Sequence, residues 1–406
     1  MNIPLYVHIP YCLKKCGYCD FFSMPSGEVP SEYVKAVARQ IEWLSKAFSV
    51  EEWTSVYIGG GTPSLLSPNG LAELCRAAKA AAPTAENCEW TIEMNPGTIT
   101  RGLLEAAADG GVNRLSFGVQ CKSDKVLRAA GRHSSERDIE EAVGLIKNFW
   151  RGKWSADLIA GLPLQTKKDL ERDIIYLAKS GAAHISLYSL TLETGTPLKE
   201  KIEREELFYD EEAAEGLWLY GRDLLESLGF EQYEVSNFAK PGNESAHNAS
   251  YWALKSYLGA GAGATGTIYG KPAGFRYTNA SDAAEYIKFW TEHRGAAGKN
   301  APPENRQKER KGLACKNVRA ALDFPCQTEE LDMATQEFEY LMMSLRTRRG
   351  ACAQDYRERF GGDLAERLFK SDYAKKWILQ KKSGSKTFYA MSREGLLFLN
   401  KFLEEL

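Results

Sequence analysis

The first 190 residues alternate between short apolar runs and longer amphipathic stretches. Six runs have the length and the β-branched and aromatic content of strands: residues 5–9, 55–58, 89–94, 114–119, 156–160 and 184–190. Between them apolar residues recur at helical spacing, and Ser135 and Thr166 stand where two of the helices should begin. Six consecutive strand–helix units predict parallel strands joined by right-handed crossovers, and therefore a layered or barrel-like α/β fold.

The pattern changes after about residue 290. Residues 295–311 are polar and basic, which favours a solvated connector over a binding patch. Helical spacing returns beyond residue 328, with Phe338, Leu341, Met342 and Leu345 on one face, and a strand-like run follows at 387–391. We therefore expect a small C-terminal α+β domain of winged-helix type. The predicted division is 1–240 for the first α/β domain, 241–294 for an extension, 295–327 for a linker and 328–406 for the C-terminal domain.

Composition and charge exclude several classes of protein. The chain has 406 residues with 52 Lys and Arg against 54 Asp and Glu, and this net charge of −2 provides no general attraction to nucleic acid or anionic lipid. No run approaches the roughly eighteen apolar residues of a membrane-spanning helix, and the N-terminus lacks the pattern of a secretory signal. Nine cysteines in a chain of this length fit a reducing compartment. We expect a cytoplasmic protein that binds no nucleic acid.

Three of the cysteines lie together directly after the first strand. Cys12, Cys16 and Cys19 have Cys-x3-Cys-x2-Cys spacing. Three thiolates on one loop can ligate three irons of a 4Fe–4S cluster and leave the fourth iron open to a small molecule. A structural zinc site normally closes with four ligands, and the other cysteines form no second pair. Buried inert thiols remain the alternative, although the polar residues between the three cysteines are poor core patterning.

Glycine-rich and polar segments follow several of the predicted strands. The triplet 59–61 follows the second strand, where missing side chains let a ligand approach backbone amides, although such a segment is often only a tight turn. Polar residues also end later strands, among them Glu93, Gln120 and Asp157. Each could instead cap a helix or hydrogen-bond within the core. In a barrel, these strand ends would converge on one mouth.

Together, these motifs resemble the oxygen-independent coproporphyrinogen III oxidase family of radical S-adenosylmethionine proteins. The resemblance rests on Tyr6-x-His-Ile-Pro10, the three-cysteine loop, Gly59-Gly-Gly-Thr-Pro63, Gly118-Val-Gln120, Gly131-Arg132, Asp157 and Gly161-Leu-Pro163. It implies a three-quarter β6/α6 barrel of TIM type with a 4Fe–4S cluster on Cys12, Cys16 and Cys19. It also implies S-adenosylmethionine, contacted by residues at the barrel mouth: Tyr6, Tyr18, Gly60, Gly61, Thr62, Glu93, Gln120, Arg132 and Asp157.

Two features indicate which branch of the family the chain resembles. The oxidases carry a fourth cysteine two residues after the third, where this chain has Phe21. Its His247-Asn248-Ala-Ser-Tyr251-Trp252 segment instead resembles a motif of the heme-chaperone branch. An imidazole can ligate heme iron, and Tyr251 and Trp252 offer flat faces for a porphyrin. Alternatively, His247 and Asn248 hydrogen-bond the barrel wall while the two aromatic residues plug its open side.

The resemblance leaves several functions open. The leading hypothesis is a heme-binding chaperone that delivers heme to acceptor hemoproteins, at the cytoplasmic membrane or elsewhere, with an electron donor for the cluster. The alternatives are oxidative decarboxylation of coproporphyrinogen III and radical chemistry on another substrate. A homodimer is also left open. Arg346, Arg348 and Arg349 do not favour DNA binding, because the chain carries little net charge and no clear recognition helix.

Overall fold

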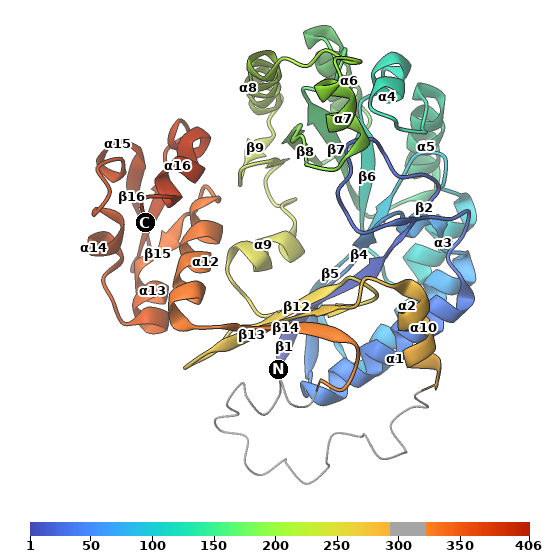
Figure 1. The fold of residues 1–406 in the computed structure, drawn as a ribbon, viewed down its shortest axis with the longest axis horizontal. Helices are drawn as coiled ribbons and strands as arrows, with labels where there is room; N and C mark the ends of the chain where they lie inside the picture. Colours follow the sequence, from blue (N-terminus) through green and yellow to red (C-terminus); the bar gives the residue numbers. More distant parts are fainter. Residues whose placement is uncertain (293–321) are drawn as a thin grey trace.

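The computed structural model describes residues 1–292 and 322–406 (Figure 1). The basic segment 295–311, expected to be a solvated connector, lies outside the described residues, as does most of the predicted linker 295–327. A large α/β unit curves around an inner side, and a smaller C-terminal unit faces that side (Figure 1).

The large unit is built on a nine-stranded sheet in the order β11-β1-β4-β5-β6-β7-β8-β10-β9. Its six central strands are parallel and follow the chain order: β1 (Asn2–Ile9), β4 (Glu52–Gly60), β5 (Thr84–Met94), β6 (Arg114–Gln120), β7 (Lys153–Ala160) and β8 (His184–Ser189). Each overlaps one of the six predicted strands, although β1, β4, β5 and β7 begin three to five residues earlier than predicted. Three short strands extend the edges: β11 (Leu258–Ala260) beside β1, and β10 (Asn237–Ala239) with β9 (Glu231–Gln232) beyond β8. Within the described residues β11 and β9 do not pair with each other, so the barrel is open.

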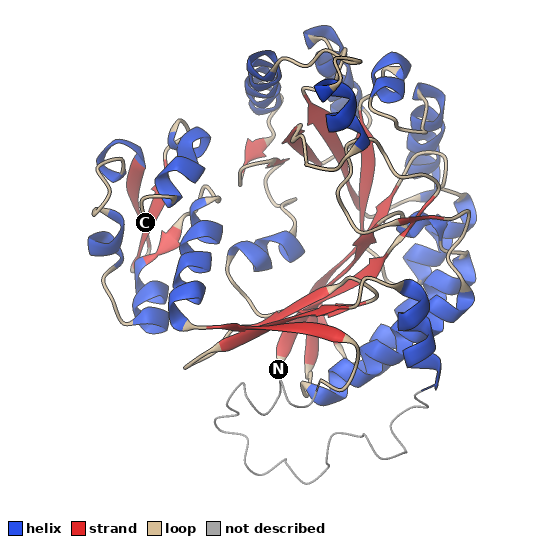
Figure 2. Ribbon diagram, in the orientation of Figure 1, coloured by secondary structure: helices blue, strands red, loops and turns tan. Residues whose placement is uncertain are grey.

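The outer face of this sheet is covered by helices (Figure 2). They are α1 (Ser31–Ala47), α2 (Pro68–Ala81), α3 (Arg101–Asp109), α4 (Asp124–Ala129), α5 (Glu136–Phe149), α6 (Lys167–Lys179) and α8 (Glu211–Ser227). Helices α5 and α6 begin with capping boxes at the predicted residues, since the side chains of Ser135 and Thr166 each accept a hydrogen bond from an amide three residues later. Strand β6 is buried along nearly its whole length, as expected for a parallel strand covered on both faces.

The strand register brings the carboxyl ends of the central strands level with one another. Ile9 in β1 is level with Gly60 in β4, and Glu93 in β5 with Ser116 in β6. Asp157 in β7 lies level with Gly118 in β6. The residues expected at the barrel mouth therefore come from neighbouring strands at one edge of the sheet.

A second sheet connects the two units. Strands β12 (Thr265–Ile268), β13 (Gly274–Asn279) and β14 (Cys326–Leu331) are antiparallel in that order. Strand β14 therefore crosses the limit predicted between residues 327 and 328, and it leads into the C-terminal unit. Helix α9 (Ala246–Trp252) lies between the C-terminal unit and the inner side of the barrel, and α10 (Ala283–Glu292) packs on α1 (Figure 1).

The C-terminal unit is a small α+β domain with its own hydrophobic core. It contains the sheet β15 (Ala351–Cys352), β17 (Lys386–Met391), β16 (Ile378–Ser383) and the helices α12 (Met333–Leu345), α13 (Ala353–Phe360), α14 (Leu364–Leu368), α15 (Ala374–Trp377) and α16 (Leu399–Leu403). One sequence prediction is wrong here, because Phe338 is 43% exposed. The predicted Leu341 and Leu345 are buried, together with Gln336, Tyr340 and Ser344, whereas Phe338 lies about 200° around the helix from Gln336.

Candidate functional site

The three-cysteine loop lies at the carboxyl edge of the barrel. Cys12 ends β2 (Tyr11–Cys12), which pairs with β3 (Met24–Pro25), and Cys16 and Cys19 follow in the connecting loop. All three are free thiols of intermediate exposure. Gly17 anchors the loop, since its amide donates to the Ala130 carbonyl (3.0 Å) and a Cβ there would lie 2.9 Å from that oxygen.

The cysteines open onto a cavity of about 510 Å³ at this edge. Of the residues expected to contact S-adenosylmethionine, eight line this cavity with the three cysteines: Tyr18, Gly60, Gly61, Thr62, Glu93, Gln120, Arg132 and Asp157. Tyr6 is the exception. Its hydroxyl hydrogen-bonds His8 Nδ1 (2.8 Å) and its ring stacks on Tyr57, so the structure does not bring Tyr6 to the cavity lining.

A chain of polar contacts connects two of the cysteines across the cavity. The Thr62 hydroxyl lies 3.4 Å from Cys12 Sγ and accepts a hydrogen bond from Asn95 Nδ2 (2.9 Å). Arg132 Nη2 donates to Asn95 Oδ1 (3.0 Å), and Arg132 Nη1 lies 3.6 Å from Cys16 Sγ. Within the described residues Arg132 forms no salt bridge, so its charge is available to stabilise thiolates and the anionic cluster they would hold.

Two buried carboxyl groups face the same cavity. Glu93 accepts hydrogen bonds from the Tyr57 hydroxyl (2.8 Å) and the Gly60 amide (3.0 Å), and burial raises its pKa to about 7. Asp157 accepts from Ser186 Oγ (2.6 Å) and Ser116 Oγ (3.0 Å), and burial raises its pKa too. Carboxyl groups placed this way can bind ribose hydroxyls or an ammonium group.

The glycine triplet 59–61 contributes to the site mainly because it lacks side chains, and less because of its backbone amides. The Gly60 amide donates to Glu93 and the Gly61 amide to the Ile9 carbonyl (2.8 Å), so neither of these donors is free for a ligand. A Cβ on Gly61 would lie 2.7 Å from the Tyr11 carbonyl oxygen and 3.0 Å from Cys12 Sγ. The absence of that Cβ lets the cysteine loop pack directly on the turn.

The cavity also contains residues that were not among the predicted contacts. Asn95 sits in the polar chain, and Tyr188 lines the wall formed by the end of β8. Both follow the rule that polar groups gather at strand ends, which is the signal that could have found them. Phe21, at the position of the oxidases' fourth cysteine, also lines the cavity and is 71% exposed.

The His247 side chain lies inside the molecule. It is 1% exposed, with Nδ1 hydrogen-bonded to Ser55 Oγ and Nε2 to the Tyr251 hydroxyl, both at 2.8 Å. Burial lowers its pKa to about 3, so the ring is neutral. In this arrangement neither nitrogen is free to bind iron. Ligation of heme by His247 stays a prediction that requires the ring to leave both partners.

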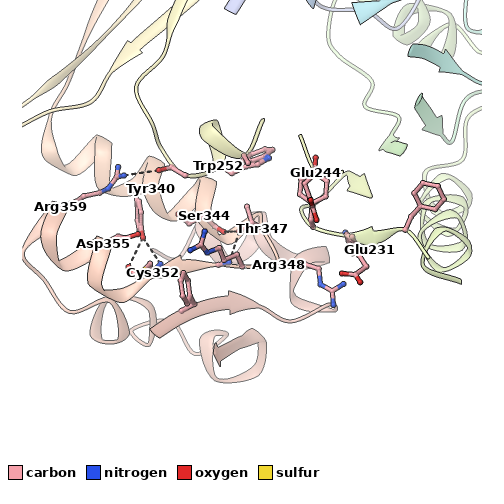
Figure 3. Close-up of a pocket in the computed structure, with 18 of the residues that line it drawn as sticks. Glu231, Glu244, Trp252, Tyr340, Ser344, Thr347, Arg348, Cys352, Asp355 and Arg359 are labelled. Carbon is pink, nitrogen blue, oxygen red and sulfur yellow. Dashed lines mark hydrogen bonds between the residues drawn. The ribbon is translucent and has the colours of Figure 1, made fainter. Parts of the chain in front are cut away.

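The rest of this motif faces two further cavities. Asn248, Tyr251 and Trp252 line a cavity of about 500 Å³, whose wall includes Tyr188 and so adjoins the cysteine cavity. Trp252 also lines a larger cavity of about 1000 Å³ between α9 and the C-terminal domain, where Figure 3 shows it across from Tyr340 and Arg348. The motif thus stands between the barrel and the C-terminal domain.

Two kinds of feature are absent from the described residues. In residues 1–292 and 322–406, no group of three or more His, Cys, Asp and Glu side chains is arranged to hold a single metal ion. The helices in the same residues are all too short or too polar to cross a membrane.

An open α/β barrel with a three-cysteine loop at its carboxyl edge defines a radical S-adenosylmethionine protein, and the model of the radical SAM superfamily matches residues 6–177. The heme chaperone HemW of Synechocystis is 37% identical over 298 residues, 71% of this chain and 72% of that protein. The heme chaperone HemW of Bacillus subtilis is 30% identical over 412 residues, 99% of each chain. The chain belongs to the HemW family. Its radical SAM domain implies a 4Fe–4S cluster and S-adenosylmethionine.

A solved structure shows the same fold over the whole chain. Coproporphyrinogen III oxidase (HemN) from Escherichia coli, a radical SAM enzyme, matches with a TM-score of 0.75 over 100% of this chain and 90% of that one, at 19% identity. This likeness confirms the predicted partial barrel with a C-terminal α+β domain, and it shows the fold alone.

Proposed function

We propose that this protein binds heme and delivers it to acceptor hemoproteins, on a scaffold that holds a 4Fe–4S cluster and S-adenosylmethionine. The observation that carries the proposal is the position of Asn248, Tyr251 and Trp252 around a cavity adjoining the cysteine cavity. Aromatic faces lining a cavity of about 500 Å³ suit a flat, largely apolar ligand. The heme chaperones among the relatives support heme as that ligand.

The cluster in this proposal is ligated by Cys12, Cys16 and Cys19, beside Arg132 and Thr62. The residues present fit it, because the three thiols lie on one loop and beside Cys16 lies a guanidinium group that has no acidic partner among residues 1–292 and 322–406. S-Adenosylmethionine would occupy the same cavity, with Glu93 and Asp157 as acceptors for its hydroxyl and ammonium groups. An electron donor, a peripheral location at the cytoplasmic membrane and a homodimer stay predictions.

Oxidation of coproporphyrinogen III is the second candidate. The barrel and its cofactors are compatible with it, whereas Phe21 at the fourth cysteine position argues against it.

Two parallel assays on anaerobically reconstituted protein separate the candidates. We expect heme-loaded protein to transfer heme to a heme-free acceptor cytochrome, and coproporphyrinogen III to remain unconverted when S-adenosylmethionine and reductant are supplied. Efficient conversion of coproporphyrinogen without heme transfer would refute the proposal. Replacing Cys12, Cys16 or Cys19 by Ala should lower the iron and sulfide content of the protein, and full content in any of the three would refute the cluster assignment.

A further inference from the structure

The cavity of about 500 Å³ is completed by the C-terminal domain. Asn248, Tyr251 and Trp252 line one part of it, and the segment between β9 and β10 contributes Glu234. Arg346, which follows α12, closes another side. The cavity therefore also contains residues outside the segment 247–252.

Three buried polar atoms in these walls have no hydrogen-bond partner in the structure. They are Glu234 Oε1, Asn237 Oδ1 and Trp252 Nε1, and Glu234 and Asn237 are 1% and 4% exposed. A buried polar group without a partner is costly, so a ligand that reached these atoms would gain by bonding them. Trp252 Nε1 can only donate, whereas the other two atoms are acceptors.

Of the basic side chains that line this cavity, one forms salt bridges with carboxylates and two do not in the described residues. Arg276 is held by Glu339 (2.6 Å) and Glu329 (3.0 Å). Neither Arg346 nor Lys255 forms a salt bridge within the parts of the chain that the structure describes, and Arg346 Nη1 donates only to the Met342 carbonyl (2.8 Å). A half-buried guanidinium without a carboxylate partner is a site that an incoming carboxylate would stabilise.

Glu234 is the single acidic residue of the cavity lining within the described residues. Its charge acts favourably on Arg346, and burial raises its pKa to about 7. An incoming carboxylate would compete with Glu234 for Arg346.

The larger neighbouring cavity fits an acidic ligand less well. Its lining has four acidic residues, Glu226, Glu231, Glu244 and Asp355, against three arginines (Figure 3). Arg348 lies 3.9 Å from Glu226, and Arg359 donates to the carbonyls of Leu254 and Ala253.

On the basis of the proposed function, we propose that the C-terminal domain binds the propionate edge of the tetrapyrrole in the smaller cavity, with Arg346 and Lys255 pairing the carboxylates and Trp252 Nε1 donating to one of them. Glu234 opposes the same carboxylates and limits the affinity. The tetrapyrrole ring would lie against Tyr251 and Trp252. Arg346 is thus a binding residue for the ligand's acid groups.

The test compares heme with its dimethyl ester, which keeps the ring and iron but has no carboxylate. Each is titrated into anaerobically reconstituted full-length protein at constant detergent concentration. Arg346→Gln should weaken heme binding by about tenfold to a hundredfold, which corresponds to the loss of a charge-assisted hydrogen bond. Glu234→Gln should tighten it, and neither variant should change binding of the ester. Arg348→Gln, in the neighbouring cavity, is the matched control and should bind heme like wild type.

Different outcomes separate this inference from the proposed function. Wild-type protein that binds no heme refutes both. Heme binding that is equal in wild type and in the Arg346 and Glu234 variants, or an ester that binds as tightly as heme, refutes the inference and leaves the proposed function standing. Cluster content measured for each variant shows whether it has folded. If Arg346→Gln does not fold, two other variants test the inference. Arg346→Lys should lower the affinity for heme less than Arg346→Gln would, and Glu234→Gln should raise it.

Discussion

Replacing His247 by Ala tests whether this side chain stabilises the barrel or serves only as a heme ligand. In the structure the ring joins Ser55 on β4 to Tyr251 on α9 and packs 5.1 Å from the ring of Tyr57. The two hydrogen bonds contribute about 0.5–1.5 kcal/mol each, and the vacated space adds a cavity term. We therefore expect the variant to lose about 2–4 kcal/mol of unfolding free energy in the absence of heme.

The assay is urea unfolding of heme-free protein, with Asn248→Ala as the matched control. Asn248 belongs to the same motif and lines the smaller cavity, and no side-chain hydrogen bond of Asn248 occurs within the described residues. We expect the control to lose less than about 1 kcal/mol. If His247→Ala unfolds at the same urea concentration as wild type and only the heme absorption spectrum changes, the structural role is refuted and axial ligation is favoured.

Three further predictions concern the cysteine loop and the surroundings of His247. Gly61→Ala should fold but hold less iron and sulfide, because its Cβ would meet the Tyr11 carbonyl oxygen at 2.7 Å and Cys12 Sγ at 3.0 Å; wild-type cluster content would contradict this. Because the folded-state pKa of His247 is about 3 and the unfolded value about 6.5, its contribution to stability is complete above pH 6.5 and should fall by about 2 kcal/mol by pH 5. This loss is measured as the difference between the urea stabilities of wild type and His247→Ala at each pH, and a pH-independent difference would count against it. Glu89→Gln should destabilise the heme-free protein by about 1–3 kcal/mol in urea, since Glu89 accepts hydrogen bonds from the His247 amide (3.0 Å) and its neighbours at the start of α9; an unchanged midpoint would refute that anchoring role.

The architecture could be read from the sequence because its signals are local. Each strand of a covered parallel sheet is a short apolar run, and Ser135 and Thr166 begin their helices through contacts only three residues long. In α12 the predicted Leu341 and Leu345 are buried, but the buried face also includes Tyr340, whose hydroxyl bonds the Cys352 backbone twelve residues away, a contact that no local spacing shows. An apolar residue such as Phe338 then stays on the exposed side.

The candidate site also combines residues that local sequence patterns predict with contacts that they do not. The strand-end rule predicted Glu93, Gln120 and Asp157, and the family resemblance added Arg132; the structure brings all four to one cavity. The environment of His247 depends on Ser55, 192 residues earlier in the chain, and no spacing rule connects the two. Arg346 likewise comes to line this cavity, beside Glu234, only through the placement of the C-terminal domain, which no local pattern of the sequence predicts.

A heme titration of anaerobically reconstituted, cluster-loaded protein tests the central claim most directly. The account predicts saturable binding of one heme per chain, with the cluster and its iron content unchanged. Absorbance that rises without saturation, or heme that binds only to protein that has lost its cluster, would contradict it.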